Sequence, residues 1–229
     1  NSTFIFFSAL TPDRGRGIDT FNLNIKMAQN FINLFNEKNV DDYHIIYISS
    51  DAVYPLSNEN IDDNTYPSPT DLYSSMHLTR EIMFKDKFKN LTILRPTLIY
   101  GFGDTHNSYG PNRFFNQMIE NKEISIFGEG LDVRDHLYID DLCKLLLIFI
   151  KKKIYGTYNL ATGNSISYKD LSNFFINNFS ELNKVNKIPV SNNPTKRYFN
   201  IEFLKNKLNY KFVDINENLK TYYNHIKSN

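Results

Sequence analysis

The chain has 229 residues, of which 41% are hydrophobic and 22% are charged, and its formal net charge is +1. This composition is close to the average for a globular protein and allows one large core or two small ones. The small net charge gives no electrostatic reason to expect nucleic acid as a partner. No apolar run approaches the roughly 20 residues of a membrane-spanning helix, so we expect no membrane contact. The single cysteine, Cys143, cannot form an internal disulfide and is expected to pack as a small hydrophobe, which fits a cytoplasmic protein.

The first hundred residues alternate apolar, strand-like runs with segments of helical periodicity. Such an alternation is typical of a parallel sheet flanked by helices. Between two of these elements, residues 51–71 are rich in Pro, Asn, Asp and Ser, which indicates a loop. The expected strands cover residues 3–10, 44–50 and 91–96, and the expected helices cover residues 21–35 and the stretch that begins at residue 73.

The strand over residues 44–50 ends in two hydroxyl side chains, Ser49 and Ser50. Buried parallel strands deliver polar groups to the carboxyl edge of a sheet in this way, and open α/β folds bind their ligands at that edge. The helix after the loop carries Tyr73 and, one turn later on the same face, His77. We therefore expect the chemistry of this protein to lie just after Ser49.

The strand-end serines and the Tyr-x-x-x-His helix together resemble the extended short-chain dehydrogenase/reductase family, which includes NAD-dependent nucleotide-sugar epimerases and dehydratases. In that family a strand-end Ser or Thr and the Tyr of a Y-x-x-x-K helix act on a sugar hydroxyl, while the Lys lowers the tyrosine's pKa and holds the cofactor ribose. The resemblance implies a Rossmann-type parallel sheet with helices on both faces and a smaller α+β substrate-binding region. It assigns Ser50 as the strand-end hydroxyl and Tyr73 as the general acid or base, with Asp51 beside them.

His77 stands at the position of the family's lysine. A histidine supplies positive charge only while it is protonated, so we expect the phenol of Tyr73 to keep a pKa near its ordinary value. Activity should then rise toward pH 9, and His77→Lys should shift the profile to lower pH.

The resemblance also implies NAD as the cofactor, with NADP left open. No G-x-x-G-x-x-G turn follows a strand in this sequence, so the glycine-rich pyrophosphate loop is not present. Residues 3–10 resemble the family's fourth strand, and we expect that roughly 60 to 75 earlier residues are missing. Alternatively, the chain is complete and binds no dinucleotide. The residues that the resemblance places at the cofactor are Ala9, Asn24, Ser49, Tyr73, His77 and Pro96, with an ordinary helix position as the equal alternative for Asn24.

Residues 1–100 are expected to form the remainder of an NAD-binding domain to which residues 137–163 return, and residues 101–229 mainly a substrate-binding region. In the second part we expect a helix from residue 110 that buries Ile119, and a helix over residues 142–150 that is buried on nearly all sides. The other elements expected there are a strand over residues 124–127, a strand over 156–163, a helix capped by Ser167, and a final helix capped by Asp214 and Glu217.

Residues 128–141 resemble the family segment G-x-G-x-x-x-R-D-x-x-x-V-x-D. In the family its arginine contacts the nucleotide diphosphate, so Arg134 is the expected phosphate ligand. Asp135 is expected to hold the loop and Asp140 to cap the helix that follows, and no metal site is expected.

Three further residues are candidates for contact with the substrate. Leu98 stands where many relatives keep an Asn, so we look to Asn107 and Asn112 for a sugar or phosphate contact. Arg197 is either a second phosphate ligand or a solvated charge.

The expected function is that of an NAD-dependent enzyme acting on a nucleotide-diphosphate sugar, as a homodimer in the full-length protein. Dehydratases of the family carry a Thr-Asp-Glu triplet after the strand, where this chain has Ser50, Asp51 and Ala52. Because the glutamate is missing, we expect an epimerase or a 4-keto reductase, with Asp51 leaving a dehydratase open. The alternative is a non-catalytic protein that binds NAD or a nucleotide sugar, kept the fold and lost the chemistry, for which His77 is the evidence.

Overall fold

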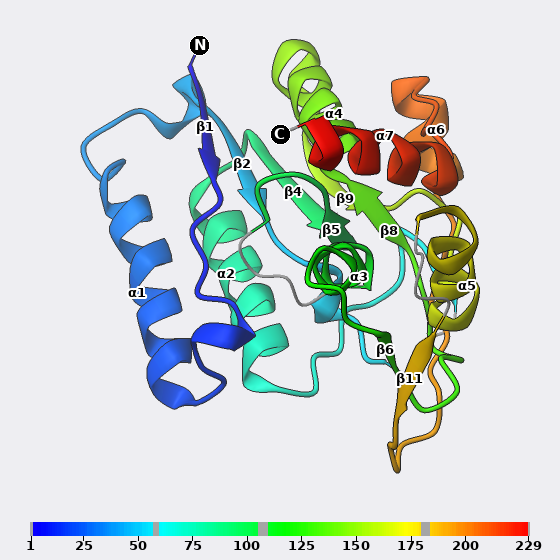
Figure 1. Cartoon of the computed structure of the whole chain (residues 1–229). Helices are drawn as coiled ribbons and strands as arrows, with labels where there is room; N and C mark the ends of the chain where they lie inside the picture. Colours follow the sequence, from blue (N-terminus) through cyan, green and yellow to red (C-terminus); the bar gives the residue numbers. More distant parts are fainter. Residues whose placement is uncertain (1, 57–59, 105–109, 180–183, 229) are drawn as a thin grey trace. The chain divides into compact units, whose positions relative to one another are not determined.

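A computed structural model describes residues 2–56, 60–104, 110–179 and 184–228 of the chain (Figure 1). The chain divides into two compact units, each built from segments that are separated in the sequence. The first unit comprises Asn1–Pro55, Asp62–Thr97 and Lys144–Leu160, and the second comprises Leu56–Ile61, Leu98–Cys143 and Ala161–Asn229.

The first unit is built on a four-stranded sheet in which all neighbouring strands are parallel. Parallel neighbours require crossover connections, and the helices of this unit supply them. The strand order is β1 (Thr3–Phe6), β2 (His44–Ile48), β4 (Leu91–Pro96) and β9 (Gly156–Leu160).

Helices cover both faces of this sheet. On one face, Phe6, Tyr47 and Ile93 form a core with Ala28 of α1 (Ile18–Asn33) and Phe84 of α2 (Leu72–Lys87). The two helices pack side by side (Figure 1).

The alternate side chains of the strands point to the other face. There Phe149 of α4 (Ile139–Lys152) meets Tyr158 of β9, with ring centroids 5.3 Å apart. The predicted Rossmann-type sheet with helices on both faces is thus confirmed.

The ends of the elements decide where polar side chains emerge. β4 has the predicted bounds, but β1 ends at Phe6 and β2 ends at Ile48, so Ser49 and Ser50 lie just beyond the sheet. The helix α2 begins at Leu72 because Asp71 and Ser74 form a capping box: the Asp71 carboxylate accepts the Ser74 N–H at 2.7 Å, and the Ser74 hydroxyl accepts the Asp71 N–H at 3.2 Å. Short 3-10 helices lie at Pro12–Arg14, Val40–Asp42 and Asp51–Val53.

The second unit combines short two-stranded sheets with helices around an aromatic core. Its centre includes Phe114, Phe115, Phe175, Leu219 and Tyr222. Its parallel pairs are β3 (Asn60–Ile61) with β12 (Tyr198–Phe199), β5 (Leu98–Tyr100) with β8 (His136–Tyr138), and β6 (Ile124–Phe127) with β11 (Val185–Ile188); β7 (Val133–Arg134) and β10 (Ile166–Ser167) are antiparallel. Its helices are α3 (Gly110–Ile119), α5 (Tyr168–Phe179), α6 (Glu202–Leu208) and α7 (Ile215–Ser228).

Four predictions are wrong: that the helix over residues 142–150 is buried on nearly all sides, that Cys143 packs as a small hydrophobe, that Ile119 is buried, and that Asp140 caps a helix. The helix α4 is amphipathic: Leu147 is 53% exposed and Cys143 is exposed, because both lie on the face opposite Leu145. Ile119, at the end of α3, is 58% exposed. Asp140 is not a cap, because α4 already begins at Ile139, and its carboxylate lies in the first helical turn, where the helix dipole favours negative charge.

In the described part of the chain, no helix is both long and apolar enough to cross a membrane.

Candidate active site

Tyr73 and His77 lie together in the first two turns of α2. The ring of Tyr73 is half-buried, and its centroid lies 4.9 Å from that of His77, with the two rings nearly perpendicular at 85°. The helix starts here because the capping box fixes its first turn, so the side chains four residues apart point to the same side. The structure therefore brings the two predicted side chains into contact.

The imidazole of His77 is uncharged at neutral pH. Only 3% of the residue is exposed, and burial, together with the nearby Arg80, lowers its pKa to about 3. Its Nδ1 lies 2.9 Å from the hydroxyl of Tyr47, whereas its Nε2 has no hydrogen-bond partner among the described residues. His77 therefore does not supply the positive charge that a lysine would bring to this position.

Arg80, which was not among the predicted site residues, lies one turn further along α2 and is entirely buried. Its Nε and Nη2 donate to the backbone carbonyl of Asn24, and its Nη1 donates to the carbonyl of Ser8 at 2.7 Å. A third contact joins Nη2 to the Asn24 side-chain oxygen at 3.1 Å. One feature of the sequence did indicate Arg80 as a site residue: it follows His77 by three residues and therefore lies on the same helix face.

Asn24 fixes the segment that follows β1. Its Oδ1 accepts the Leu10 N–H at 2.8 Å, and its Nδ2 donates to the Leu10 carbonyl at 3.1 Å. The pair of bonds holds the stretch that contains Ala9 at the carboxyl end of β1. The contact of Asn24 and Ala9 with a cofactor stays a prediction.

The two strand-end serines have different environments. Ser49 is buried, and its hydroxyl donates to Oε1 of Glu81 at 2.7 Å. Ser50 is half-buried, and its Oγ accepts the N–H of Ala52 at 3.1 Å, which caps the short helix Asp51–Val53. Ser49 is therefore held inside the protein, and Ser50 is the more accessible of the two hydroxyls.

A buried polar network lies beneath these serines. Arg95 donates to both carboxylate oxygens of Glu81, from Nε at 2.9 Å and from Nη2 at 2.6 Å, and from Nη1 to the hydroxyl of Tyr54 at 2.7 Å. The Tyr54 hydroxyl in turn donates to Asn159 at 2.9 Å. Burial opposes the charge of Arg95, but the bonds to Glu81 raise its pKa above the ordinary value. The network joins α2, β4 and β9, and Pro96, which ends β4, is buried directly after it.

In the second unit, Arg134 already has partners within the protein. Its Nη1 donates to the carbonyls of Val133 and Thr195, and its Nη2 donates to the Thr195 hydroxyl at 2.6 Å and approaches Asp132 at 3.3 Å. The residue is only partly buried. Its contact with a phosphate stays a prediction.

The prediction that Arg197 is a solvated charge is wrong. The residue is 4% exposed, and its guanidinium lies 5.8 Å from the centroid of the Phe199 ring. A buried guanidinium has lost most of its hydration and depends on contacts within the protein, whereas a solvated guanidinium keeps its water. Its role as a phosphate ligand stays a prediction.

Asn112 and Asp135 hold loops of the second unit. The Asn112 side chain accepts the N–H of Gly101 and donates to the carbonyl of the same residue, at 3.0 Å each, and donates to Asp104 at 2.7 Å. Asp135 accepts hydrogen bonds from the N–H and hydroxyl of Thr162, which confirms its predicted role in the loop. A substrate contact of Asn112 stays a prediction, and Asn107 lies outside the described residues.

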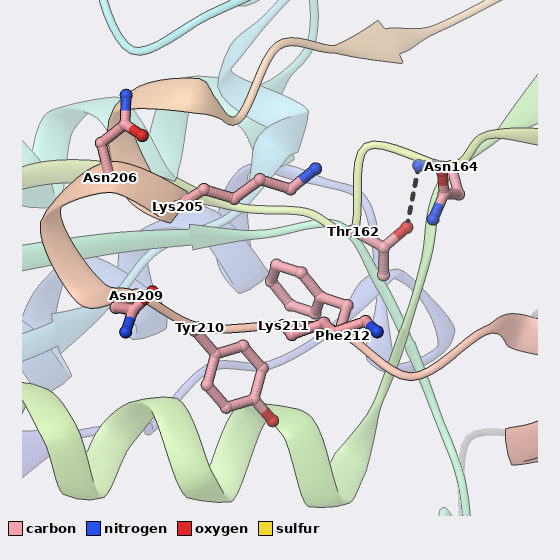
Figure 2. A pocket seen from close by; sticks show the side chains of 8 residues that line it. All are labelled: Thr162, Asn164, Lys205, Asn206, Asn209, Tyr210, Lys211 and Phe212. Atoms are coloured by element: carbon pink, nitrogen blue, oxygen red, sulfur yellow. Dashed lines mark hydrogen bonds between the residues drawn. The ribbon is translucent and has the colours of Figure 1, made fainter.

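The second unit also contains a polar cavity of about 600 Å³. Figure 2 shows its lining, in which the Thr162 hydroxyl accepts the N–H of Asn164 at 3.1 Å and Tyr210 lies beside Lys211. The hydroxyl of Tyr210 donates to Asp141 at 2.6 Å. None of the site residues predicted from the sequence lines this cavity.

Buried histidines make the stability of the chain depend on pH. Burial lowers the pKa of His77 and of His136 to about 3, and that of His44 to about 4. Unfolded histidines bind a proton below pH 6.5, whereas the folded ones stay neutral until much lower pH, so protonation favours the unfolded state. We expect the free energy of unfolding to fall by about 1.4 kcal/mol per pH unit for each such histidine as the pH drops from 6.5 toward 4.

Urea unfolding at a series of pH values measures this slope. In the variant His136→Phe, the new ring can keep the edge contacts with Tyr100 and Tyr168. The free energy of unfolding of this variant should depend on pH less steeply, by about 1.4 kcal/mol per pH unit, the contribution of one histidine. An unchanged slope in that variant would contradict the assignment.

The model of the NAD dependent epimerase/dehydratase family matches residues 13–161. The chain belongs to this family. A dTDP-D-glucose 4,6-dehydratase of Dictyostelium discoideum is 30% identical over 161 residues, which cover 61% of this chain and 36% of the relative. The Homo sapiens dTDP-D-glucose 4,6-dehydratase is 28% identical over 144 residues, covering 60% of this chain and 41% of the relative. The chain thus spans less than half the length of these relatives.

Solved structures of the family have the same fold. A UDP-glucuronic acid 4-epimerase from Bacillus cereus, in complex with UDP-glucuronic acid and NAD, is 25% identical and matches with a TM-score of 0.75 over 90% of this chain and 67% of its own. A dTDP-glucose 4,6-dehydratase from Bacillus anthracis, in complex with NAD, matches with a TM-score of 0.83 at 18% identity, covering 100% of this chain and 73% of its own. At that identity the likeness shows the fold alone.

The site suits one end of the cofactor that the family uses. Nε2 of His77 is buried without a partner among the described residues, and a ribose hydroxyl would satisfy it. The pyrophosphate normally binds at a helix N-terminus behind a glycine-rich turn, and such a turn is absent from the sequence. The residues therefore fit the nicotinamide ribose and provide no glycine-rich turn for the pyrophosphate.

Proposed function

We propose that the whole protein is an NAD-dependent enzyme acting on a nucleotide-diphosphate sugar. The observation that carries this proposal is the contact of Tyr73 with a neutral His77 whose Nε2 lacks a partner among the described residues, next to the carboxyl edge of a parallel sheet. Membership in the family and the likeness to a UDP-sugar epimerase support it. We assign the first unit to the NAD-binding domain and the second mainly to substrate binding.

Each residue of the site has a proposed task. Tyr73 takes a proton from a sugar hydroxyl or returns it, and Ser50 orients that hydroxyl. His77 donates from Nε2 to the cofactor ribose. NAD, when bound, accepts and returns the hydride.

Epimerisation or reduction of a 4-keto sugar is the favoured reaction. Elimination of water needs a second base, and the residue at the matching position is Ala52. Because the relatives include 4,6-dehydratases, and because Asp51 follows Ser50, a dehydratase is the second candidate.

A panel of UDP, dTDP and GDP sugars, incubated with the whole protein and NAD or NADH, tests the proposal. An epimerase gives a product of unchanged mass with a new sugar NMR spectrum, a dehydratase gives a product lighter by one water, and a reductase consumes NADH. Tight binding of a nucleotide sugar without any turnover would instead favour the non-catalytic binding protein.

The 229 residues by themselves should not bind NAD with micromolar affinity. The physical reason is that the sequence has no glycine-rich turn to present backbone N–H groups to the pyrophosphate. Isothermal calorimetry with NAD measures this directly, and ADP-ribose serves as a control for the adenosine half of the ligand. Micromolar binding would show that another part of the chain holds the pyrophosphate.

A further inference from the structure

The charge of Arg80 has no acidic partner in the described part of the chain. The side chain is fully buried, yet no carboxylate of the described residues lies within 4.0 Å of its guanidinium. Burying an unpaired charge costs several kcal/mol, so proteins keep one where it acts on something. Arg95, the other buried arginine of this unit, shows the contrast, because it is paired with both oxygens of Glu81.

The groups that respond to the Arg80 charge are two phenols and the imidazole of His77. The guanidinium interacts electrostatically with Tyr47, with Tyr73 and with the imidazole of His77. Its other contacts are the two backbone carbonyls, the Asn24 side-chain oxygen and the face of Phe6, 5.3 Å from the ring centroid. A guanidinium stays protonated even when burial lowers its pKa, so the charge is present at every working pH.

A chain of contacts leads from Arg80 to Tyr73. The Tyr47 hydroxyl lies in the field of the Arg80 charge and 2.9 Å from Nδ1 of His77, to which it can donate its proton. A neutral imidazole that accepts at Nδ1 carries its hydrogen on Nε2. The ring of His77 then meets Tyr73 edge to face.

We propose that Arg80 is the positioning residue that supplies the fixed positive charge for the phenolate of Tyr73, acting through Tyr47 and His77. The proposal rests on the proposed function, in which Tyr73 transfers the proton. It explains how a neutral side chain can occupy position 77: the cation lies one turn further along the same helix, where it cannot lose its proton. A phenolate next to such a charge is stabilised across the pH range, whereas a histidine would help only at acidic pH.

Other ionisable groups around Tyr73 do not account for the same effect. Arg16, from the segment before α1, lines a small cavity with Tyr73 but is exposed, so solvent and salt screen its charge. Burial raises the pKa of Tyr47, so it remains a neutral phenol. Glu81 also acts on Tyr47, but its carboxylate is neutralised by Arg95. Arg80 is therefore the buried cation of this site.

The test is the titration of Tyr73 in the 229-residue chain, followed by NMR with ring-carbon-labelled tyrosine. The Tyr73→Phe spectrum identifies its resonance among the 15 tyrosines. We expect Arg80→Gln to raise the pKa of Tyr73 by about one unit or more, and Arg80→Lys, which keeps the charge, to raise it much less. Arg16→Gln is the matched control for an exposed arginine and should leave the titration nearly unchanged at high salt.

A second set of variants leaves Arg80 and its structural hydrogen bonds in place, in case Arg80→Gln does not fold. His77→Gln can still accept and donate, so it should keep the pKa of Tyr73, whereas His77→Leu and Tyr47→Phe interrupt the chain of contacts and should raise it. An unshifted titration in folded Arg80→Gln, or in both interrupting variants, would overturn the proposal.

The titration needs neither cofactor nor substrate. A whole protein without turnover would therefore contradict the proposed function and would not change the result for Arg80. Where turnover is found, the acid limb of the pH profile should move to higher pH in Arg80→Gln and stay in place in His77→Gln.

Discussion

Replacing Glu81 by alanine is expected to lower the free energy of unfolding by about 3–5 kcal/mol, the usual cost of breaking a buried ion pair. The substitution leaves the guanidinium of Arg95, which is 4% exposed, without its carboxylate, and it removes the acceptor of the buried Ser49 hydroxyl. Urea unfolding followed by circular dichroism measures the loss.

Two controls make this result specific. Glu120→Ala removes an exposed ion pair with Lys122 and should cost less than about 1 kcal/mol. The double variant Glu81→Ala with Arg95→Met removes both charges and should recover part of the loss, because two apolar side chains replace a charge without a partner. A Glu81→Ala variant as stable as Glu120→Ala would show that the buried pair contributes little.

Removing the hydroxyl of Tyr73 is expected to lower turnover of the whole protein by about 10²- to 10⁴-fold, the usual contribution of a positioned general acid or base. Phenylalanine keeps the ring and its edge contact with His77, so the unfolding midpoint should hardly change. Steady-state kinetics on the nucleotide sugar that the panel identifies gives the measurement. The matched control is Tyr66→Phe, a tyrosine that is 85% exposed and should leave turnover as it is. Full activity in Tyr73→Phe would assign the proton transfer to another group.

The neutral state of His77 changes the pH behaviour expected from the sequence. With no cation in view, the sequence predicted a tyrosine close to its ordinary pKa and an activity that rises toward pH 9. The structure agrees that His77 is uncharged, but it adds a buried guanidinium on the same helix. The pH profiles of two variants separate these descriptions. If no cation lies near Tyr73, Arg80→Gln should leave the profile in place and His77→Lys should move it to lower pH. If Arg80 supplies the charge, Arg80→Gln should move the acid limb to higher pH.

Periodicity and turn chemistry in the sequence by themselves determined the sheet and its principal helices. The strand over residues 91–96 was placed to the residue, and the strand-end serines and the Tyr73 helix were brought to the carboxyl edge of β2 as expected. These features are local: an apolar run, a cluster of turn-forming residues and a one-turn spacing fix them. The exposed face of α4 was not predicted, because a run of apolar residues does not show which face of a helix packs against another element.

Only the tertiary structure decided which polar side chains of the site carry charge and where they bind. The partners of Arg80 are 56 and 72 residues away in the sequence, and the partner of Ser49 is 32 residues away. Helical spacing places Arg80 on the face of His77, but only the packing of α2 on α1 and β2 buries it and removes competing water. Burial keeps His77 neutral, because desolvation lowers the pKa of an imidazole to below neutrality. Arg80 stays charged in spite of its burial, because a guanidinium titrates too high for desolvation to bring its pKa to neutrality.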